Sequence, residues 1–325
     1  MKVLITGSSG YIGKCLFHYL NSKKIKVIGV DKYVPIQTKN NLKLNLLNKK
    51  KIDKLLKEIK PDIVIHLAAQ SLVDEKITKK RYIDNNNKAT INLLESMNKN
   101  NIRNIIFSST AAVYRSKNKP IFEYDKLKPL SNYAKSKLDC EKIIKKNKYI
   151  KYVILRFFNV CSALKLKKIY GEFHNPETHL IPTVIYKCVA RQKVFIYGNN
   201  FNTYDKTCVR NFIHIFDICE SIFKSIKYIV SKKRSSIFNI GSKINYSVNE
   251  IIRECEKFLN QKIKLKIMSK RTGDTDFLSC NINKAKKYLN WSPKKSYIKK
   301  IIKDEKEWID NFTNKGLRRR FKYYT

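Results

Sequence analysis

The stretch Lys2–Asp31 reads KVLITGSSGYIGKCLFHYLNSKKIKVIGVD and predicts a strand, a glycine loop, a helix and a second strand. The first apolar run leads into Gly7, Gly10 and Gly13, and glycines at these places permit a tight turn and a close backbone approach to a pyrophosphate. The helix N-terminus that follows favours anions. Asp31 ends the second apolar run, where its carboxylate can accept from ribose hydroxyls and would repel a 2′-phosphate. The stretch therefore predicts a dinucleotide site that takes NAD and not NADP.

The glycine spacing is G-x-x-G-x-x-G, one residue looser than the usual G-x-G-x-x-G fingerprint. A glycine pattern by itself also fits an ordinary strand-to-helix turn. The order of strand, loop, helix, strand and acid favours the dinucleotide site over that alternative.

The charge is extreme, with 69 Lys and Arg against 26 Asp and Glu in 325 residues and a formal net charge of +43. Such a balance suggests a nucleic-acid or acidic-membrane partner. The lysines are scattered over nearly every polar segment, however, and no module of interleaved aromatic and basic residues stands out. We therefore expect solvated faces of an enzyme, no specific nucleic-acid partner, and nonspecific polyanion binding that salt weakens.

Eight cysteines are dispersed along the chain without a C-x-x-C pair, which predicts free thiols and a reducing compartment. No apolar stretch approaches the roughly twenty residues that a membrane-spanning helix needs. The first predicted strand begins at Lys2, which leaves no room for a signal peptide. We expect a cytoplasmic protein without a membrane partner.

Apolar and helical patterns alternate after Asp31, which is typical of βαβ units around a parallel sheet. Helices are predicted at 52–59, 87–98 and 133–146, and strands at 62–67, 102–109 and 152–158. The regular alternation ends after residue 159, where helices are predicted at 182–191, 215–230 and 247–259. The fold class expected is α/β: a Rossmann-like, doubly wound parallel sheet at 1–160 and a smaller mixed α/β substrate domain mainly at 161–325. The basic tail 316–325 is expected to fray.

A second informative group combines a strand-end Ser108-Ser109-Thr110 with a downstream Tyr133 and Lys137. Tyr133 and Lys137 are four apart and share one face of a helix. An ammonium next to a phenol stabilises the phenolate and lowers its pKa, as would the nicotinamide cation. Tyr133 is thus a candidate base that takes a proton from a substrate hydroxyl while hydride leaves the same carbon. Thr110 would hydrogen-bond the reacting oxygen, or else cap local backbone.

The Y-x-x-x-K pattern alone has little value, because it also occurs at 19–23, 124–128 and 228–232. Only the pair at 133–137 lies downstream of a strand-end hydroxyl cluster and just ahead of an apolar strand. That context selects it.

At this point the chain resembles the extended short-chain dehydrogenase/reductases and, within them, the UDP-glucose 4-epimerases. The similarity runs through motifs along nearly the whole length, at 6–13, 66–69, 84–87, 107–114, 133–137, 155–160, 171–172, 176–182, 207–214, 239–241 and 271–274. The resemblance implies a UDP-hexose substrate, bound NAD and a homodimer. It also implies that a strand near 237–241 returns to the first domain.

The resemblance assigns roles residue by residue. It makes Tyr133 the catalytic base, Lys137 its activator and nicotinamide-ribose ligand, and Thr110 the partner of the substrate hydroxyl. The cofactor-binding set that it implies is Gly7, Gly10, Tyr11, Ile12, Gly13, Asp31, Asn45, Leu67, Ala68, Ala69, Asn86, Ser108, Tyr133, Lys137 and Phe158. The substrate-binding set that it implies is Thr110, Tyr133, Asn159, His179, Leu180, Tyr197, Arg210, Arg271, Asp274 and Leu278.

The charges of the substrate set agree with a nucleotide sugar. Arg210 and Arg271 can grip a diphosphate with forked hydrogen bonds, and Asp274 can accept from ribose hydroxyls. The resemblance places Tyr197 near the uracil and Leu278 near the sugar C2 substituent. Leu is intermediate in size there, so the sequence leaves tolerance of an N-acetyl group open.

Five positions depart from the family pattern without removing a catalytic group; they are Asn45, Arg115, Ala134, Lys206 and Asn211. Ala111-Ala112 stands where a dehydratase carries Asp-Glu, which argues against dehydration. A decarboxylase, another nucleotide-sugar epimerase and a non-catalytic NAD-binding regulator stay as alternatives. No two of the five histidines have metal-ligand spacing on one element, so no metal site is expected.

Overall fold

A computed structural model describes residues 1–34, 37–73, 76–172, 177–271 and 273–312. The basic tail at 316–325, for which fraying was expected, lies outside the described residues.

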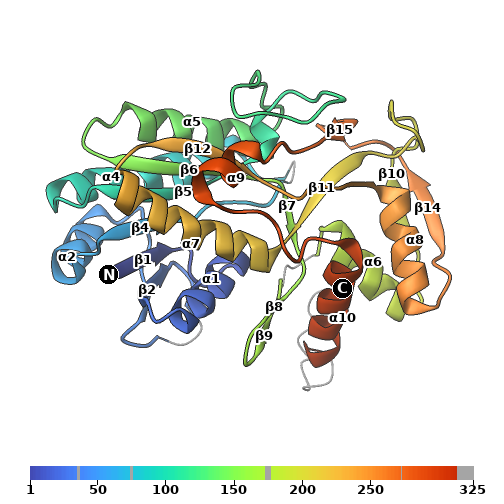
Figure 1. Ribbon diagram of the computed structural model, residues 1–325, viewed down its shortest axis with the longest axis horizontal. Helices are drawn as coiled ribbons and strands as arrows, with labels where there is room; N and C mark the ends of the chain where they lie inside the picture. The colour runs from blue at the N-terminus through green and yellow to red at the C-terminus, as the bar shows by residue number, and fades with distance from the viewer. Residues whose placement is uncertain (35–36, 74–75, 173–176, 272, 313–325) are drawn as a thin grey trace.

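The centre of the molecule is a seven-stranded, all-parallel sheet in the order β12-β6-β5-β4-β1-β2-β3 (Figure 1). Its strands are β1 (Lys2–Thr6), β2 (Lys26–Asp31), β3 (Asn41–Lys43), β4 (Ile63–His66), β5 (Asn104–Thr110), β6 (Lys151–Phe157) and β12 (Ser236–Ile240). The inner strands are apolar on both faces because helices cover both sides of a parallel sheet.

Two apolar layers enclose this sheet. On one side pack α1 (Tyr11–Ser22), α7 (Ile215–Lys232) and α9 (Asn283–Leu289). On the other side pack α2 (Lys49–Ile59), α4 (Ala89–Lys99) and α5 (Asn132–Lys146). The predicted α/β, doubly wound class is confirmed.

The helical segment before α4 departs from regular geometry. α3 (Lys79–Tyr82) runs into a π-helix, η1 (Ile83–Lys88), before α4 continues the same direction. A π-turn inside a helix often marks a functional site. Here it carries Asn86, one of the residues expected at the cofactor.

A second lobe forms around β11 (Val209–His214), which pairs with β7 (Asn159–Cys161), β13 (Asn245–Ser247) and β15 (Phe277–Leu278). Beside it β10 (Val194–Tyr197) pairs with β14 (Leu265–Met268), and β8 (Leu164–Lys165) pairs with β9 (Ile169–Tyr170). The helices α6 (Leu180–Val189), α8 (Val248–Leu259) and α10 (Ile298–Phe312) enclose its core. In Figure 1 α8, β10 and β14 lie at the end of the molecule away from α2.

The second half of the chain also builds the first layer, because β12, α7 and α9 pack with the large sheet. The division at residue 160 stays a proposal. Ser247 caps α8 in a reciprocal capping box with Glu250. No helix in the described ranges combines the length and the apolar character needed to cross a membrane.

Candidate active site

Two glycines near the turn between β1 and α1, Gly7 and Gly13, have no room for a side chain. Gly7 adopts a φ of +73°, and a Cβ there would lie 2.7 Å from the backbone nitrogen of Ala68. A Cβ on Gly13 would lie 2.0 Å from the Gly7 carbonyl oxygen. Helix α1 begins after Gly10 with no side chain capping it and no acid in its first turn. The first amide groups of α1 thus form a cradle that fits a dinucleotide pyrophosphate.

Asp31 lies at the carboxyl end of β2, next to this loop. Its carboxylate accepts hydrogen bonds from the backbone amides of Ser9 at 3.0 Å and Tyr33 at 3.1 Å. These two bonds fix the acid where the sequence argument places a ribose. The Asn45 side chain is exposed and its oxygen accepts from the Leu47 amide at 2.9 Å, which closes a local turn. Its expected contact with the cofactor stays a prediction.

Several residues of the expected cofactor set have side chains already engaged within the protein. Buried Asn86 accepts from the Gln70 amide at 2.7 Å and donates to the Ser136 hydroxyl at 2.8 Å, which ties η1 to α5. Ser108 donates to the His66 carbonyl at 3.2 Å. The Phe158 side chain packs in the core. These three residues can therefore contact a cofactor mainly through their backbone atoms and by shaping the wall of the site.

The remaining members of that set line the same end of the sheet. Leu67, Ala68 and Ala69 follow β4 and are partly buried. Tyr11 and Ile12 form the first turn of α1, and the Tyr11 hydroxyl donates to the Ser162 carbonyl in the second lobe. The set therefore surrounds the glycine loop from β4 and α1.

Thr110, Tyr133 and Lys137 come from two adjoining elements. Thr110 is the last residue of β5, and Tyr133 and Lys137 occupy the first two turns of α5, whose N-cap is Ser131. The Thr110 hydroxyl accepts from the Ala112 amide at 3.2 Å, the local cap that the sequence left as an alternative. The same side chain lies close enough to Tyr133 to lower the pKa of its phenol.

The pKa of Tyr133 departs from the expected direction. Burial raises the pKa of Tyr133 to about 12, and Thr110 opposes this rise only in part. The sequence argument expected Lys137 to lower it, but desolvation of the phenolate dominates in the protein alone.

Lys137 is itself buried, with 2% of its surface exposed. Its ammonium lies 4.3 Å from the centre of the Phe107 ring, and burial lowers the pKa of Lys137 to about 8. Among the described residues no carboxylate forms a salt bridge with it. A buried ammonium without an ionic partner costs free energy and suits a site that receives polar hydroxyl groups.

The second lobe gathers the residues expected at a nucleotide. Arg271 donates from Nε to Asp274 Oδ2 at 3.0 Å and lies over the Tyr197 ring at 4.8 Å. Arg210 Nη2 lies 3.5 Å from Asp274 Oδ1, and its Nη1 donates to the Thr275 carbonyl at 2.7 Å. The neighbouring Arg271 and Asp274 thus form one cluster with Tyr197 and Arg210, which lie more than sixty residues earlier in the chain.

Strand register ties this cluster to the candidate catalytic group of Thr110, Tyr133 and Lys137. Leu278 on β15 pairs with Arg210, and Asn159 on β7 pairs with Phe212 of the same strand β11. Ser116, which follows Thr110 in the chain, donates to the Phe277 carbonyl at 2.8 Å. The loop after β5 therefore abuts the strand that carries Leu278.

His179 and Leu180 lie at the start of α6, where His179 is the N-cap residue. His179 Nδ1 lies 3.2 Å from Glu172 Oε1 and 3.2 Å from Glu177 Oε1. One potential ligand atom from each of the three lies within 4.8 Å of the others, which is the arrangement of a possible metal site. The sequence-based expectation of no metal site rests on the spacing of histidine pairs. That criterion does not detect a group of one imidazole and two carboxylates.

A buried polar network next to the candidate catalytic residues was also missed. Arg156 on β6 binds Glu141 on α5 with two hydrogen bonds, of 2.9 Å and 2.7 Å, and both side chains are 2% exposed. The Ser109 hydroxyl, next to Thr110, donates to Glu141 at 2.5 Å. Arg156 also donates to the Tyr114 hydroxyl at 2.7 Å. The network fixes α5 against the ends of β5 and β6.

Comparison with known proteins decides the family. The model of the NAD dependent epimerase/dehydratase family matches residues 3–241. The chain belongs to this family. It is 35% identical to the UDP-glucose 4-epimerase of Streptococcus mutans over 96% of this chain and 98% of that protein. The corresponding enzyme of Lactobacillus helveticus is 34% identical over 95% of this chain and 97% of its own length.

Solved structures agree. The UDP-glucose 4-epimerase from Bifidobacterium longum, crystallised with NAD+ and UDP, superposes with a TM-score of 0.89 at 28% identity. The match covers 97% of this chain and 99% of that one. Membership of the family makes this chain an NAD-dependent enzyme, and the glycine cradle and Asp31 described above fit that cofactor.

Proposed function

We propose that the protein interconverts UDP-glucose and UDP-galactose by inverting carbon 4 through a 4-keto intermediate. The observation that carries this proposal is the group of Thr110, Tyr133 and Lys137 at the end of β5, in the same parallel sheet as the glycine loop after β1. The cluster of Arg210, Arg271 and Asp274 is tied to the loop after β5 through strand β15. The named activity of the relatives at 34–35% identity supports it.

Tyr133 performs the proton step in this proposal. Its phenol takes the proton of the sugar 4-hydroxyl as that carbon is oxidised and returns it when the carbon is reduced on the opposite face. Because burial holds the pKa of Tyr133 near 12, the phenolate must be favoured by positive charge that arrives on binding and by Lys137. NAD supplies the hydride acceptor at carbon 4 and, when reduced, the hydride donor.

The remaining residues hold the substrate. Arg210 and Arg271 grip the diphosphate, Tyr197 lies against the base, and Asp274 accepts from the ribose. In this proposal Asn159 on β7, with His179 and Leu180 at the start of α6, completes the substrate-binding set. Ala111-Ala112 offers no acid or base next to Thr110, which argues against elimination of water.

The test is turnover of UDP-galactose, followed through the anomeric proton signals in NMR. The unmodified protein is expected to produce UDP-glucose without net consumption of NAD. Tyr133→Phe is expected to lose about 10²–10⁴-fold in kcat while it keeps the fold and bound NAD. The control is Tyr124→Phe, which alters another Y-x-x-x-K match at a tyrosine that is 82% exposed. Near-native turnover by Tyr133→Phe would refute the assignment.

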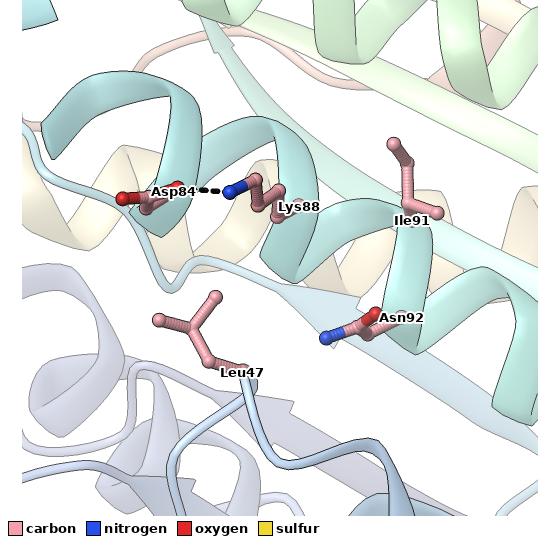
Figure 2. Close-up of a pocket in the computed structure, with 5 residues that line it drawn as sticks. All are labelled: Leu47, Asp84, Lys88, Ile91 and Asn92. Atoms are coloured by element: carbon pink, nitrogen blue, oxygen red, sulfur yellow. Dashed lines mark ion pairs between the residues drawn. The ribbon is translucent and has the colours of Figure 1, made fainter. Parts of the chain in front are cut away.

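We also propose a cytoplasmic homodimer. The eight cysteines are all free and buried, which suits a reducing compartment. Exposed apolar side chains gather around η1 and α4, with Ile83 39% and Ile91 38% exposed. A cavity of about 360 Å³ is lined by Leu47, Asp84, Lys88, Ile91 and Asn92. Figure 2 shows these side chains and the ion pair of Asp84 and Lys88. Sedimentation at low and high salt tests the dimer, because the net charge of +43 opposes self-association most strongly at low salt.

A further inference from the structure

The acidic group around His179 extends beyond the three residues already described. Glu305 on α10 is 1% exposed, and neither of its carboxylate oxygens has a hydrogen-bond partner of ordinary geometry among the described residues. A buried carboxylate in that condition is costly and needs an explanation.

The contacts of α10 show which way this carboxylate faces. One turn after Glu305, the Trp308 indole donates to the Glu172 carbonyl at 2.8 Å, and the Trp308 ring packs over Gly171. One turn before it, the Ile301 carbonyl accepts from the Ser162 hydroxyl at 3.0 Å. Residues three or four apart share one face of a helix. Glu305 therefore lies on the face of α10 that packs against Ser162 and Glu172.

The electrostatics agree with this placement. Burial raises the pKa of Glu305 well above its usual range, and Glu172 and Glu177 raise it further while His179 and the Ser162 amide lower it. Burial lowers the pKa of His179, but the Glu177 hydrogen bond and the charge of Glu172 outweigh it and bring that pKa to about 9. The four groups therefore act on one another.

We propose that Glu172, Glu177 and His179 bind Zn²⁺, and that the buried Glu305 carboxylate, which lies outside their 4.8 Å group, completes the site as the fourth ligand. One imidazole and three carboxylates make four ligands of the kinds that zinc accepts in closed tetrahedral sites. With metal–ligand distances of about 2.0–2.2 Å, tetrahedral ligands lie about 3.3–3.6 Å apart. The two separations of 3.2 Å from His179 Nδ1 are close to the short end of that range. An imidazole is a poor ligand for Mg²⁺ or Ca²⁺, which prefer oxygen.

Such a site would tie α10 to the segment that begins α6. It includes His179 and lies next to Leu180, both of which are expected at the substrate, and it differs from the proposed catalytic group on β5 and α5. Because His179 is also expected at the substrate, the readout is metal binding and not turnover.

The experiment uses the untagged full-length protein, stripped with EDTA, desalted and titrated with ZnCl₂ by calorimetry, with bound metal counted by mass spectrometry. We expect one equivalent of zinc, a rise in Tm on zinc binding, and no comparable effect of MgCl₂. Glu305→Gln should weaken zinc at least tenfold and abolish the Tm rise. Its metal-free Tm should not fall, because an amide replaces a buried acid. Glu307→Gln, on the same helix but paired with Lys165 at the surface, is the matched control and should behave as the native protein.

Glu177→Gln provides a second variant at a side chain that is 24% exposed and therefore tolerant of substitution. It too should weaken zinc at least tenfold. The proposal is overturned if the native protein takes up no stoichiometric zinc, if both variants bind it as the native protein does, or if MgCl₂ reproduces the effect. Those results would leave His179 as an imidazolium that neutralises its acidic neighbours.

Discussion

Replacing Lys137 with Met should stabilise the protein while abolishing turnover. The ammonium is buried over the Phe107 ring, and among the described residues no carboxylate pairs with it. Met keeps most of the length and apolar stem of the side chain and removes the charge. At pH values where the native lysine is charged, the variant avoids the free-energy cost of burying the ammonium. The variant should therefore be more stable than the native protein at those pH values.

The magnitude follows from the pKa. Lowering the pKa of Lys137 from 10.5 to about 8 corresponds to about 3 kcal/mol of unfavourable free energy when the group is charged. Loss of the contact with Phe107 gives back about 1 kcal/mol. The net gain is thus about 2 kcal/mol, or about 3 °C in Tm for a chain of this size.

The pH dependence gives the sharper test. Since the folded-state pKa lies below the unfolded value, the unfolded chain binds more protons between pH 8 and 10.5, and native stability rises with pH in that window. The advantage of Lys137→Met should be full below pH 8 and should vanish by about pH 10.5.

The assay is urea denaturation of the NAD-free protein at pH 7 and pH 10, with Lys135→Met as the exposed control on the same helix. The control should leave stability unchanged within about 0.5 kcal/mol. A destabilised Lys137→Met protein at pH 7, or a gain that does not depend on pH, would refute the reasoning.

Two other substitutions test neighbouring parts of the site. NAD should bind far more tightly than NADP by calorimetry, and Asp31→Ser should narrow the gap because the carboxylate that repels a 2′-phosphate is gone; equal affinities in the unmodified protein would contradict the role of Asp31. Glu141→Gln should cost about 3 kcal/mol in urea denaturation, because it leaves the buried Arg156 guanidinium without a countercharge. Asp139→Asn on the same helix breaks only the exposed pair with Lys142 and should cost under about 1 kcal/mol; similar losses in the two variants would show that burial does not set the strength of the Arg156 pair.

The sequence was enough for the parts of the fold that depend on local pattern. The order of strand, glycine loop, helix and acid at 2–31 recurs as β1, α1 and β2, because tight turns and apolar periodicity act over short distances. The helix expected at 133–146 is α5 (Asn132–Lys146), one residue longer than predicted. Context around the pair at 133–137 selected the tyrosine that lies beside Thr110.

Properties that depend on burial were less accessible. The direction of the Tyr133 pKa was wrong for the protein alone, because desolvation is a tertiary quantity that a four-residue spacing does not report. Asn211 replaces a family Asp without apparent reason in the sequence. In the structure its amide donates to the Ser242 and Ile244 carbonyls, which an ionised carboxylate could not do.

Lys206 is a second such position. It replaces a family glycine and adopts a φ of +63°, a left-handed conformation that glycine takes without strain.

The group of Glu172, Glu177, His179 and Glu305 was missed for another reason. Glu172 and Glu177 lie in the chain before α6, His179 is the N-cap residue of α6, and Glu305 lies on α10. Only tertiary packing brings these segments together.

The most direct test of the central claim is the fate of a deuterium placed on carbon 4 of UDP-galactose. If Tyr133 moves only the hydroxyl proton while hydride leaves carbon 4 and returns to it, the UDP-glucose formed should keep the deuterium at carbon 4. Mass spectrometry combined with NMR would measure this during turnover in ordinary water. Full retention is the predicted result, and exchange of the label with solvent protons during epimerisation would contradict the account.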